Sequence, residues 1–211
     1  MKTNEEINRL YEEINDTAQA LVRSIPEGHV TDYEWLLEHI ELAGQGGYQR
    51  RFRHYWRMNA ARLGRGFYEV YFAKLAEARA REIELGPLMR DLRVPAKGRL
   101  QCSFATKLLH CVNPELPIYD SLVAGFYGFE PTANGLPEEK LRRLLTFYAF
   151  LKSEQVRVLE GGLLRPAMEA FRERFRPVRF TEQKVVDSLI WGMYRARQAG
   201  LVRGGAGVAV I

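Results

Sequence analysis

Residues 94–123 read VPAKGRLQCSFATKLLHCVNPELPIYDSLV. The opening Val-Pro-Ala-Lys-Gly predicts a tight turn, because proline and glycine interrupt helices and are frequent at turns. A run with helical spacing follows and ends at the Asn-Pro pair of positions 113–114. Residues 117–119 form a short extended piece, and Asp120 has the position of an N-cap for a helix over 121–127. The segment therefore predicts a turn, a helix, an extended link and the start of a further helix.

Helical spacing of apolar residues continues on both sides of this segment. It predicts a first helix over about 7–21, which Pro26 and Gly28 end. Thr31 and Glu34 have the spacing of a capping box and predict the start of a second helix. Further helices are expected over about 48–63, 67–83 and 86–93, from the turn to about 112, and over about 138–159, 163–174 and 181–199. No internal repeat and no alternating strand interrupts this pattern, so we predict an all-α fold of roughly nine helices.

The composition is that of a folded chain. Its 211 residues, 46% of them hydrophobic, limit the fold to one domain or to two small lobes that share a cleft. The 31 Lys and Arg residues exceed the 26 Asp and Glu residues, and 24 of these basic residues are arginine. Arginine suits bidentate contacts with phosphate and stacking on bases. The net charge of +5 permits a polyanion partner without requiring one.

The residue types exclude several kinds of site. Two cysteines, Cys102 and Cys111, are too few for a disulfide framework, a four-cysteine zinc site or a four-cysteine iron–sulfur cluster. The four histidines have no metal-binding spacing, and no Gly-rich phosphate loop or Ser–His–Asp signature occurs. We therefore expect no metal and no cofactor. The polar, acidic start and the lack of a long apolar run predict a cytoplasmic chain without signal peptide or membrane span.

The stretch 48–65 is rich in arginine and contains no acidic residue. Its arginines are Arg50, Arg51, Arg53, Arg57, Arg62 and Arg65. On a continuous helix Arg50, Arg53 and Arg57 share one face, which predicts a surface that tracks DNA phosphates. The alternative is an amphipathic helix whose basic face is only solvated. The sequence leaves both interpretations open.

The turn at 94–98 matches the pattern hydrophobic-Pro-x-x-Gly, with helical sequence on both sides. This is the outline of a helix-hairpin-helix element, which directs backbone N–H groups at the start of its second helix toward a DNA phosphate. We expect Lys97, Gly98 and Arg99 to contact DNA. The alternative is a plain turn between two helices.

The hairpin outline and Asp120 together resemble the helix-hairpin-helix DNA glycosylase superfamily. Its members carry the hairpin, then a helix, then a Pro-Val-Asp or Pro-Ile-x-Asp motif that opens the next helix. In this chain Gly98 and Asp120 are 22 positions apart, an interval that resembles that of the family. Segments 103–110 and 117–121 also resemble 8-oxoguanine DNA glycosylase-like bacterial proteins. The resemblance covers residues 94–123, about one-seventh of the chain.

The resemblance implies an architecture and a reaction. The fold would consist of two helical lobes around a cleft, one over 28–119 and the other over 1–27 and 120–211. The chain would act in DNA repair as a monomer on double-stranded DNA, in the cytoplasm and associated with the nucleoid. It would cleave the N-glycosidic bond of a damaged or modified purine similar to 8-oxoguanine. The Asp120 carboxylate would stabilise the positive charge that develops on the sugar.

Lys107 is the candidate nucleophile. Family members that also act as lyases place a lysine two residues after the last hairpin glycine, where this chain has Leu100. Lys107 lies seven residues further on and shares an expected polar face with Ser103 and His110. Ala96 replaces the usual first glycine of the hairpin, which predicts a distorted turn.

These departures leave alternatives open. In the first alternative, Lys107 is a solvated residue and water is the nucleophile. The enzyme is then a hydrolase without lyase activity. In the second alternative, the chain is a non-catalytic DNA-binding protein on the same scaffold. In the third, it is a helical interaction protein that never contacts DNA. His110 is interpreted as a polar-face or core histidine rather than a ligand. The aromatic residues of 147–150 are interpreted as core, and the pair Asp187 and Trp191 as packing at the edge of the core.

Overall fold

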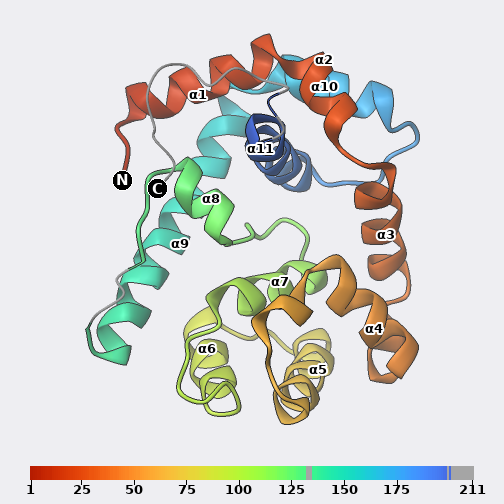
Figure 1. The fold of residues 1–211 in the computed structure, drawn as a ribbon, viewed down its shortest axis with the longest axis vertical. Helices are drawn as coiled ribbons and strands as arrows, with labels where there is room; N and C mark the ends of the chain where they lie inside the picture. The colour runs from red at the N-terminus through yellow and green to blue at the C-terminus, as the bar shows by residue number, and fades with distance from the viewer. Residues whose placement is uncertain (132–134, 199, 201–211) are drawn as a thin grey trace.

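A computed structural model describes residues 1–131, 135–198 and 200 of the chain. Every regular element in these ranges is a helix, which confirms the all-α prediction (Figure 1). The α-helices are α1 (Asn4–Asp16), α2 (Ala18–Ser24), α3 (Glu27–Glu38), α4 (Gly46–Tyr55), α5 (Arg65–Ala80), α6 (Leu85–Arg93), α7 (Cys102–Val112), α8 (Ser121–Phe126), α9 (Pro137–Glu160), α10 (Arg165–Arg174) and α11 (Glu182–Gln198). Short 3-10 helices η1 (Ile40–Gly44) and η2 (Met58–Ala61) lie on either side of α4. None of the described helices combines the length and the apolar character that a membrane crossing needs.

The helices pack in two sets. In the first set, α10 and α11 pack against both α1 and α2, and α8 packs against α11. In the second set, α3 packs against α4, and α7 packs against α3, α5 and α6. Figure 1 shows the first set at the top and the second at the bottom, with the long helix α9 reaching from one to the other. Helix α9 contacts α11 and α6 accordingly. The division into lobes by residue range stays a prediction.

Helix α7 is enclosed by its neighbours. Every residue from Phe104 to Cys111 is buried, including the polar residues Thr106, Lys107 and His110. The prediction that these polar residues form an exposed face of the helix is therefore wrong. The reason is that α3 also packs on α7, and the hydroxyl of Tyr33 in α3 lies 2.7 Å from Nε2 of His110.

The helix expected over 48–63 is broken after Tyr55. Arg57 (φ 52°) and Arg62 (φ 50°) adopt left-handed conformations on either side of η2. Trp56 and Met58 are both buried, whereas a continuous helix places residues two apart on nearly opposite faces. The break at Arg57 lets both side chains enter the core. The prediction that Arg57 shares a helical face with Arg50 and Arg53 is therefore wrong.

Helix α3 begins earlier than expected. It starts at Glu27, after Pro26, whose backbone angle (φ −65°) already suits a helix entry. Thr31 lies inside the helix, and its hydroxyl donates to the carbonyl oxygen of Glu27 (3.4 Å). The capping box predicted at Thr31 is wrong. A capping box is present instead at the start of α1, where Thr3 and Glu6 cap each other's backbone N–H groups.

The turn between α6 and α7 is confirmed. The Gly98 N–H donates to the Arg93 carbonyl (3.0 Å), and the Lys97 N–H donates to the Val94 carbonyl (3.1 Å). The left-handed positions are Lys97 (φ 56°) and Gly98 (φ 80°). Ala96 is not left-handed, and it is fully buried. The conformation of Ala96 therefore does not require a glycine, and its side chain is buried in the core.

Candidate active site

A cleft of about 720 Å³ lies between α7, the start of α8 and α11. Its walls come from His29 and from residues within 55–61, 100–107, 118–122 and 184–191. The volume is within the range of small-molecule sites, and the lining combines apolar and aromatic side chains with a few charged groups. Both predicted catalytic residues are part of these walls.

Lys107 is buried in the cleft wall, with 8% of its surface exposed. Its Nζ donates to the Ser103 hydroxyl (3.0 Å) and lies 5.5 Å from the centre of the Trp56 ring. Burial lowers the pKa of Lys107, and the charges of Asp120 and Asp187 partly oppose that shift. The interpretation of Lys107 as a solvated surface residue is wrong. A lowered pKa increases the fraction of free amine near neutral pH, which is the nucleophilic form.

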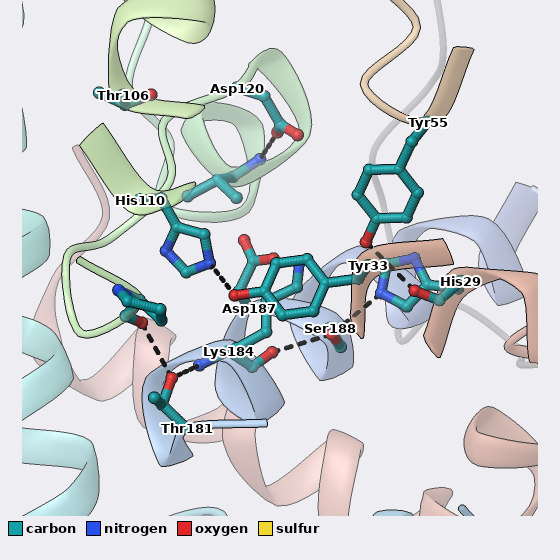
Figure 2. Close-up of polar contacts among 12 residues, drawn as sticks. His29, Tyr33, Tyr55, Thr106, His110, Asp120, Thr181, Lys184, Asp187 and Ser188 are labelled. Atoms are coloured by element: carbon teal, nitrogen blue, oxygen red, sulfur yellow. Dashed lines mark hydrogen bonds and ion pairs between the residues drawn. The ribbon is translucent and has the colours of Figure 1, made fainter. Parts of the chain in front are cut away.

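Asp120 is the N-cap of α8, as the sequence predicted. Its Oδ1 accepts hydrogen bonds from the backbone N–H groups of Leu122 (2.9 Å) and Val123 (2.9 Å). Figure 2 shows the Asp120 carboxylate with one such contact to a backbone nitrogen. Its Oδ2 has no hydrogen bond from any described residue. One carboxylate oxygen is therefore fixed by the helix end, and Asp120 lines the cleft.

Thr106 joins α7 to the extended segment before α8. Its side chain is fully buried, and its hydroxyl accepts a hydrogen bond from the N–H of Tyr119 (3.0 Å). Thr106 precedes Lys107, and Tyr119 precedes Asp120. This contact therefore holds α7 against the segment that leads to Asp120.

Leu100, at the position where lyase members of the superfamily have lysine, also lines the cleft. It is partly buried and lies in the turn, because α7 begins only at Cys102. Lys107 is in the second turn of α7, so its amine enters the same cleft from a position further along the helix.

Lys184 and Asp187 of α11 form a buried ion pair that the sequence reasoning missed. Lys184 is 1% exposed, and its Nζ lies 2.6 Å from Oδ2 of Asp187. The Nζ also lies 5.0 Å from the Tyr33 ring centre and 5.4 Å from the Trp56 ring centre. Trp191 is partly buried and packs against the core, as interpreted, and it also lines the cleft together with Asp187. The available signal was the spacing of polar residues at 184, 187 and 188 on one face of a helix that must also bury apolar residues.

Breaking this ion pair should destabilise the fold. Replacing Asp187 by alanine leaves the Lys184 ammonium buried without its partner, and we expect a loss of about 3–5 kcal/mol in the free energy of unfolding. The double variant Lys184→Met, Asp187→Ala removes both charges and should recover most of that loss. Urea unfolding at pH 7 measures both changes. If Asp187→Ala unfolds at the wild-type midpoint, the pair contributes nothing to stability.

His29 and Trp191 form an aromatic pair in the cleft wall. Their rings stack with centres 4.5 Å apart and planes 11° apart. Nε2 of His29 lies 3.0 Å from the Ser188 hydroxyl (Figure 2). Burial, with the positive charges of Lys184 and Arg195, holds the pKa of His29 well below its usual value. His29 is therefore a neutral imidazole.

His110 is a core residue, as one of the sequence interpretations held. Its Nδ1 lies 2.6 Å from the Leu116 carbonyl and must carry the hydrogen, so Nε2 accepts from the Tyr33 hydroxyl (Figure 2). Burial lowers the pKa of His110 to about 3. His110 thus ties α3 to α7 and to the segment that leads to Asp120. The aromatic residues of 147–150 are also buried or partly buried, as expected.

Of the predicted DNA-contacting arginines, Arg50 and Arg53 lie three positions apart on α4, and Arg57 lies beyond its end. Arg50 is exposed on α4, and the guanidinium of Arg53 lies 4.8 Å from the centre of the Tyr68 ring. Neither lines the cleft, whereas exposed Arg57 does. The arginines of this stretch also have acidic partners from outside it: Arg51 is 2.7 Å from Asp32, and Arg65 is 2.7 Å from Glu69.

Lys97, Gly98 and Arg99 are exposed on the hairpin turn. Gly98 and Arg99 line a second hollow of about 340 Å³, together with Leu100 and Arg143. Leu100 belongs to both hollows, so the hairpin borders the cleft that holds the amine and the carboxylate.

Comparisons of the chain with protein-family models, curated proteins and solved structures gave no match. Within the residues that the structure describes, no group of three or more His, Cys, Asp or Glu side chains is arranged to hold a metal ion.

Proposed function

We propose that the chain is a DNA N-glycosylase that removes a damaged or modified purine, similar to 8-oxoguanine, from double-stranded DNA. The observation that carries this proposal is the buried amine of Lys107 in the same cleft as the capping carboxylate of Asp120. A buried amine with a lowered pKa that shares a cleft with a carboxylate is typical of a functional site. The glycosylase resemblance assigns the same carboxylate to catalysis.

Asp120 supplies the negative charge. Cleavage of the N-glycosidic bond develops positive charge on C1′ and on the ring oxygen of the sugar. A carboxylate already fixed beside that charge stabilises the transition state without having to reorganise. The two N–H groups that hold Oδ1 of Asp120 supply this fixation, and Oδ2 faces no competing donor from the described residues.

Lys107 supplies the nucleophile. Its Nζ forms a bond to C1′, and the base departs with the electron pair of the N-glycosidic bond and takes up the proton that Nζ loses. Cleavage of the C1′–O4′ bond then turns the new C1′–Nζ bond into an imine, while O4′ receives a proton. The imine is the intermediate from which strand cleavage proceeds. If water attacks C1′ instead, the enzyme is a hydrolase without lyase activity.

The substrate base must leave the DNA stack before it reaches the cleft. Extrusion costs a few kcal/mol, less for a damaged base, and contacts with phosphates offset this cost. The hairpin residues Lys97, Gly98 and Arg99 are exposed and are assigned to those contacts. Gly98 and Arg99 line the second hollow, which shares Leu100 with the cleft. Arg50, Arg53 and Arg57 are assigned as a second group of residues that contact phosphates. In this proposal the two sets of helices correspond to the two lobes of the glycosylase architecture.

The direct test is incubation with a panel of duplexes that each carry one base lesion, with an undamaged duplex as control. Base release and strand cleavage are scored separately. We expect release from at least one oxidised purine and none from the control. Salt-dependent binding without release from any duplex would identify a non-catalytic DNA-binding protein. The absence of binding to every duplex would identify an interaction protein instead.

Charge reversal on the hairpin should weaken duplex binding. The double variant Lys97→Glu, Arg99→Glu removes two phosphate contacts, so affinity should fall about tenfold or more and the salt slope by about 2. The control is Arg9→Glu, Arg23→Glu, which makes the same change of charge at exposed positions of α1 and α2. Fluorescence anisotropy across a salt series measures both quantities. Identical slopes for the hairpin variant and the wild type would remove the hairpin from the DNA surface.

A further inference from the structure

The start of the chain holds the far end of helix α8, the helix that has Asp120 as its N-cap (Figure 1). The Lys2 ammonium donates to the carbonyl oxygens of Gly125 (3.0 Å) and Phe126 (2.8 Å). The Lys2 backbone N–H donates to the carbonyl oxygen of Tyr127 (3.0 Å). The last carbonyl groups of a helix have no partner within it, and the negative end of the helix dipole lies there. A cation with several N–H donors therefore stabilises this end of α8.

Gly128 allows Lys2 to approach α8 this closely. It has a left-handed backbone (φ 65°), and a Cβ atom at this position would lie 2.9 Å from Cγ of Lys2 and 3.2 Å from its backbone nitrogen. A residue with a side chain would be strained here and would push Lys2 away from the helix. Lys2 and Gly128 therefore form one contact between the start of the chain and the end of α8.

A continuous chain of hydrogen bonds links Lys2 to the Asp120 carboxylate. The Lys2 N–H donates to the Tyr127 carbonyl (3.0 Å), and the Tyr127 N–H donates to the Val123 carbonyl (3.2 Å). The Val123 N–H in turn donates to Oδ1 of Asp120 (2.9 Å). Hydrogen bonds in such a chain polarise and strengthen one another. Helix α8 has only six residues, and so short a helix is not stable in water by its own hydrogen bonds, so contacts at both ends set the position of the cap.

We propose that Lys2 is a positioning residue for Asp120. Lys2 does not line the cleft, and it acts through α8 by keeping the last turn of that helix closed while the first turn holds the carboxylate. The inference rests on the proposed function, in which the carboxylate must be fixed before charge develops on the sugar. Without the Lys2 ammonium, the last turn of α8 opens more often, and the cap at its other end opens with it.

Hydrogen exchange of the capping amides tests this link without any DNA. Lys2→Met keeps an apolar stem and removes the ammonium. Exchange of the Leu122 and Val123 N–H groups, followed by NMR, should become about tenfold or more faster in this variant. Amides of α5, in the other set of helices, are the internal reference and should keep their wild-type rates. Lys2→Arg again supplies N–H donors and should restore part of the protection.

Base release tests whether the link reaches the chemical step. Lys2→Met should slow single-turnover release by about tenfold to 100-fold, because a displaced charged group loses much of its effect. In an Asp120→Asn background the same substitution should change the rate by about twofold or less, because the charge that Lys2 positions is already absent.

Arg9→Met is the matched control for Lys2→Met. Arg9 is an exposed residue of α1 whose charge, like that of Lys2, interacts with Glu6, and it has no hydrogen bond to α8 within the described residues. Arg9→Met should leave both the exchange of the capping amides and the rate of base release unchanged.

Two outcomes overturn the inference: exchange of Leu122 and Val123 at wild-type rates in Lys2→Met, and a loss of base release that is equally large in the Asp120→Asn background. If circular dichroism shows that Lys2→Met is not folded, Gly128→Ala decides, because it displaces Lys2 and keeps the ammonium. The two amides should again exchange faster, and wild-type exchange in Gly128→Ala overturns the inference.

The two proposals fail separately. Base release by the wild type with unchanged exchange in Lys2→Met leaves the proposed function standing and rejects the role of Lys2. Faster exchange in Lys2→Met, without base release from any duplex by the wild type, rejects the glycosylase proposal and supports the link between Lys2 and the Asp120 cap.

Discussion

Replacing Asp120 by asparagine should reduce base release from a lesion duplex by about 100- to 1000-fold, while folding and DNA binding survive. The asparagine carbonyl can still accept the N–H groups of Leu122 and Val123, so the cap on α8 remains. What is lost is the negative charge beside the developing positive charge on the sugar. Single-turnover base release measures the effect on the chemical step directly.

Asp32→Asn is the matched control for Asp120→Asn. Asp32 is an aspartate outside the cleft that pairs with Arg51, and its substitution should leave the rate of base release unchanged. Unfolding in urea checks that both variants keep their structure. An Asp120→Asn enzyme that releases the base at the wild-type rate would show that Asp120 is a helix cap and nothing more.

The sequence was sufficient to predict those features of the fold that depend only on neighbouring residues. Proline and glycine set the turn at 94–98, and a single aspartate set the start of α8. These two features place the candidate carboxylate in the chain without any knowledge of tertiary packing. In the structure, the residues between Gly98 and Asp120 form the end of the turn, the helix α7 and an extended link.

The sequence failed where burial depends on contacts distant in the chain. Lys107 was expected on a polar face because only residues within α7 were considered, and packing by α3 encloses that helix. The break at Arg57 follows from the burial of Trp56 and Met58, which spacing alone does not reveal.

The aromatic wall of the cleft is also a product of tertiary structure. His29 and Ser188 are 159 positions apart and meet only in the folded chain. Ser188, a polar residue three positions before Trp191 on a buried face of α11, indicated that this helix makes a polar contact. The sequence did not identify His29 as the partner in that contact.

Replacing Lys107 by glutamine should abolish a covalent adduct between the protein and lesion DNA. If Nζ attacks C1′, borohydride reduces the imine to a stable linkage that gel electrophoresis detects. DNA affinity should change little, because one phosphate contact at most is lost. Lys74→Gln is the control, since Lys74 pairs with Asp91 and does not line the cleft.

The pH dependence of trapping tests the identity of the amine. Burial lowers the pKa of Lys107, so adduct formation should rise with pH and level off below the pKa of an ordinary lysine. The Asp120 charge raises the pKa of Lys107, so Asp120→Asn should move this rising limb to lower pH, although every rate is smaller. A limb that does not move in Asp120→Asn would place the reacting amine elsewhere.

The remaining outcomes of the Lys107→Gln experiment identify the nucleophile. An adduct that persists in Lys107→Gln comes from another amine, and Lys184, Lys97 and the N-terminus are then tested in turn. Lys184 is the first of these, because it lines the same cleft but is engaged by Asp187 at 2.6 Å. Base release by the wild type without an adduct on any substrate means that water attacks C1′.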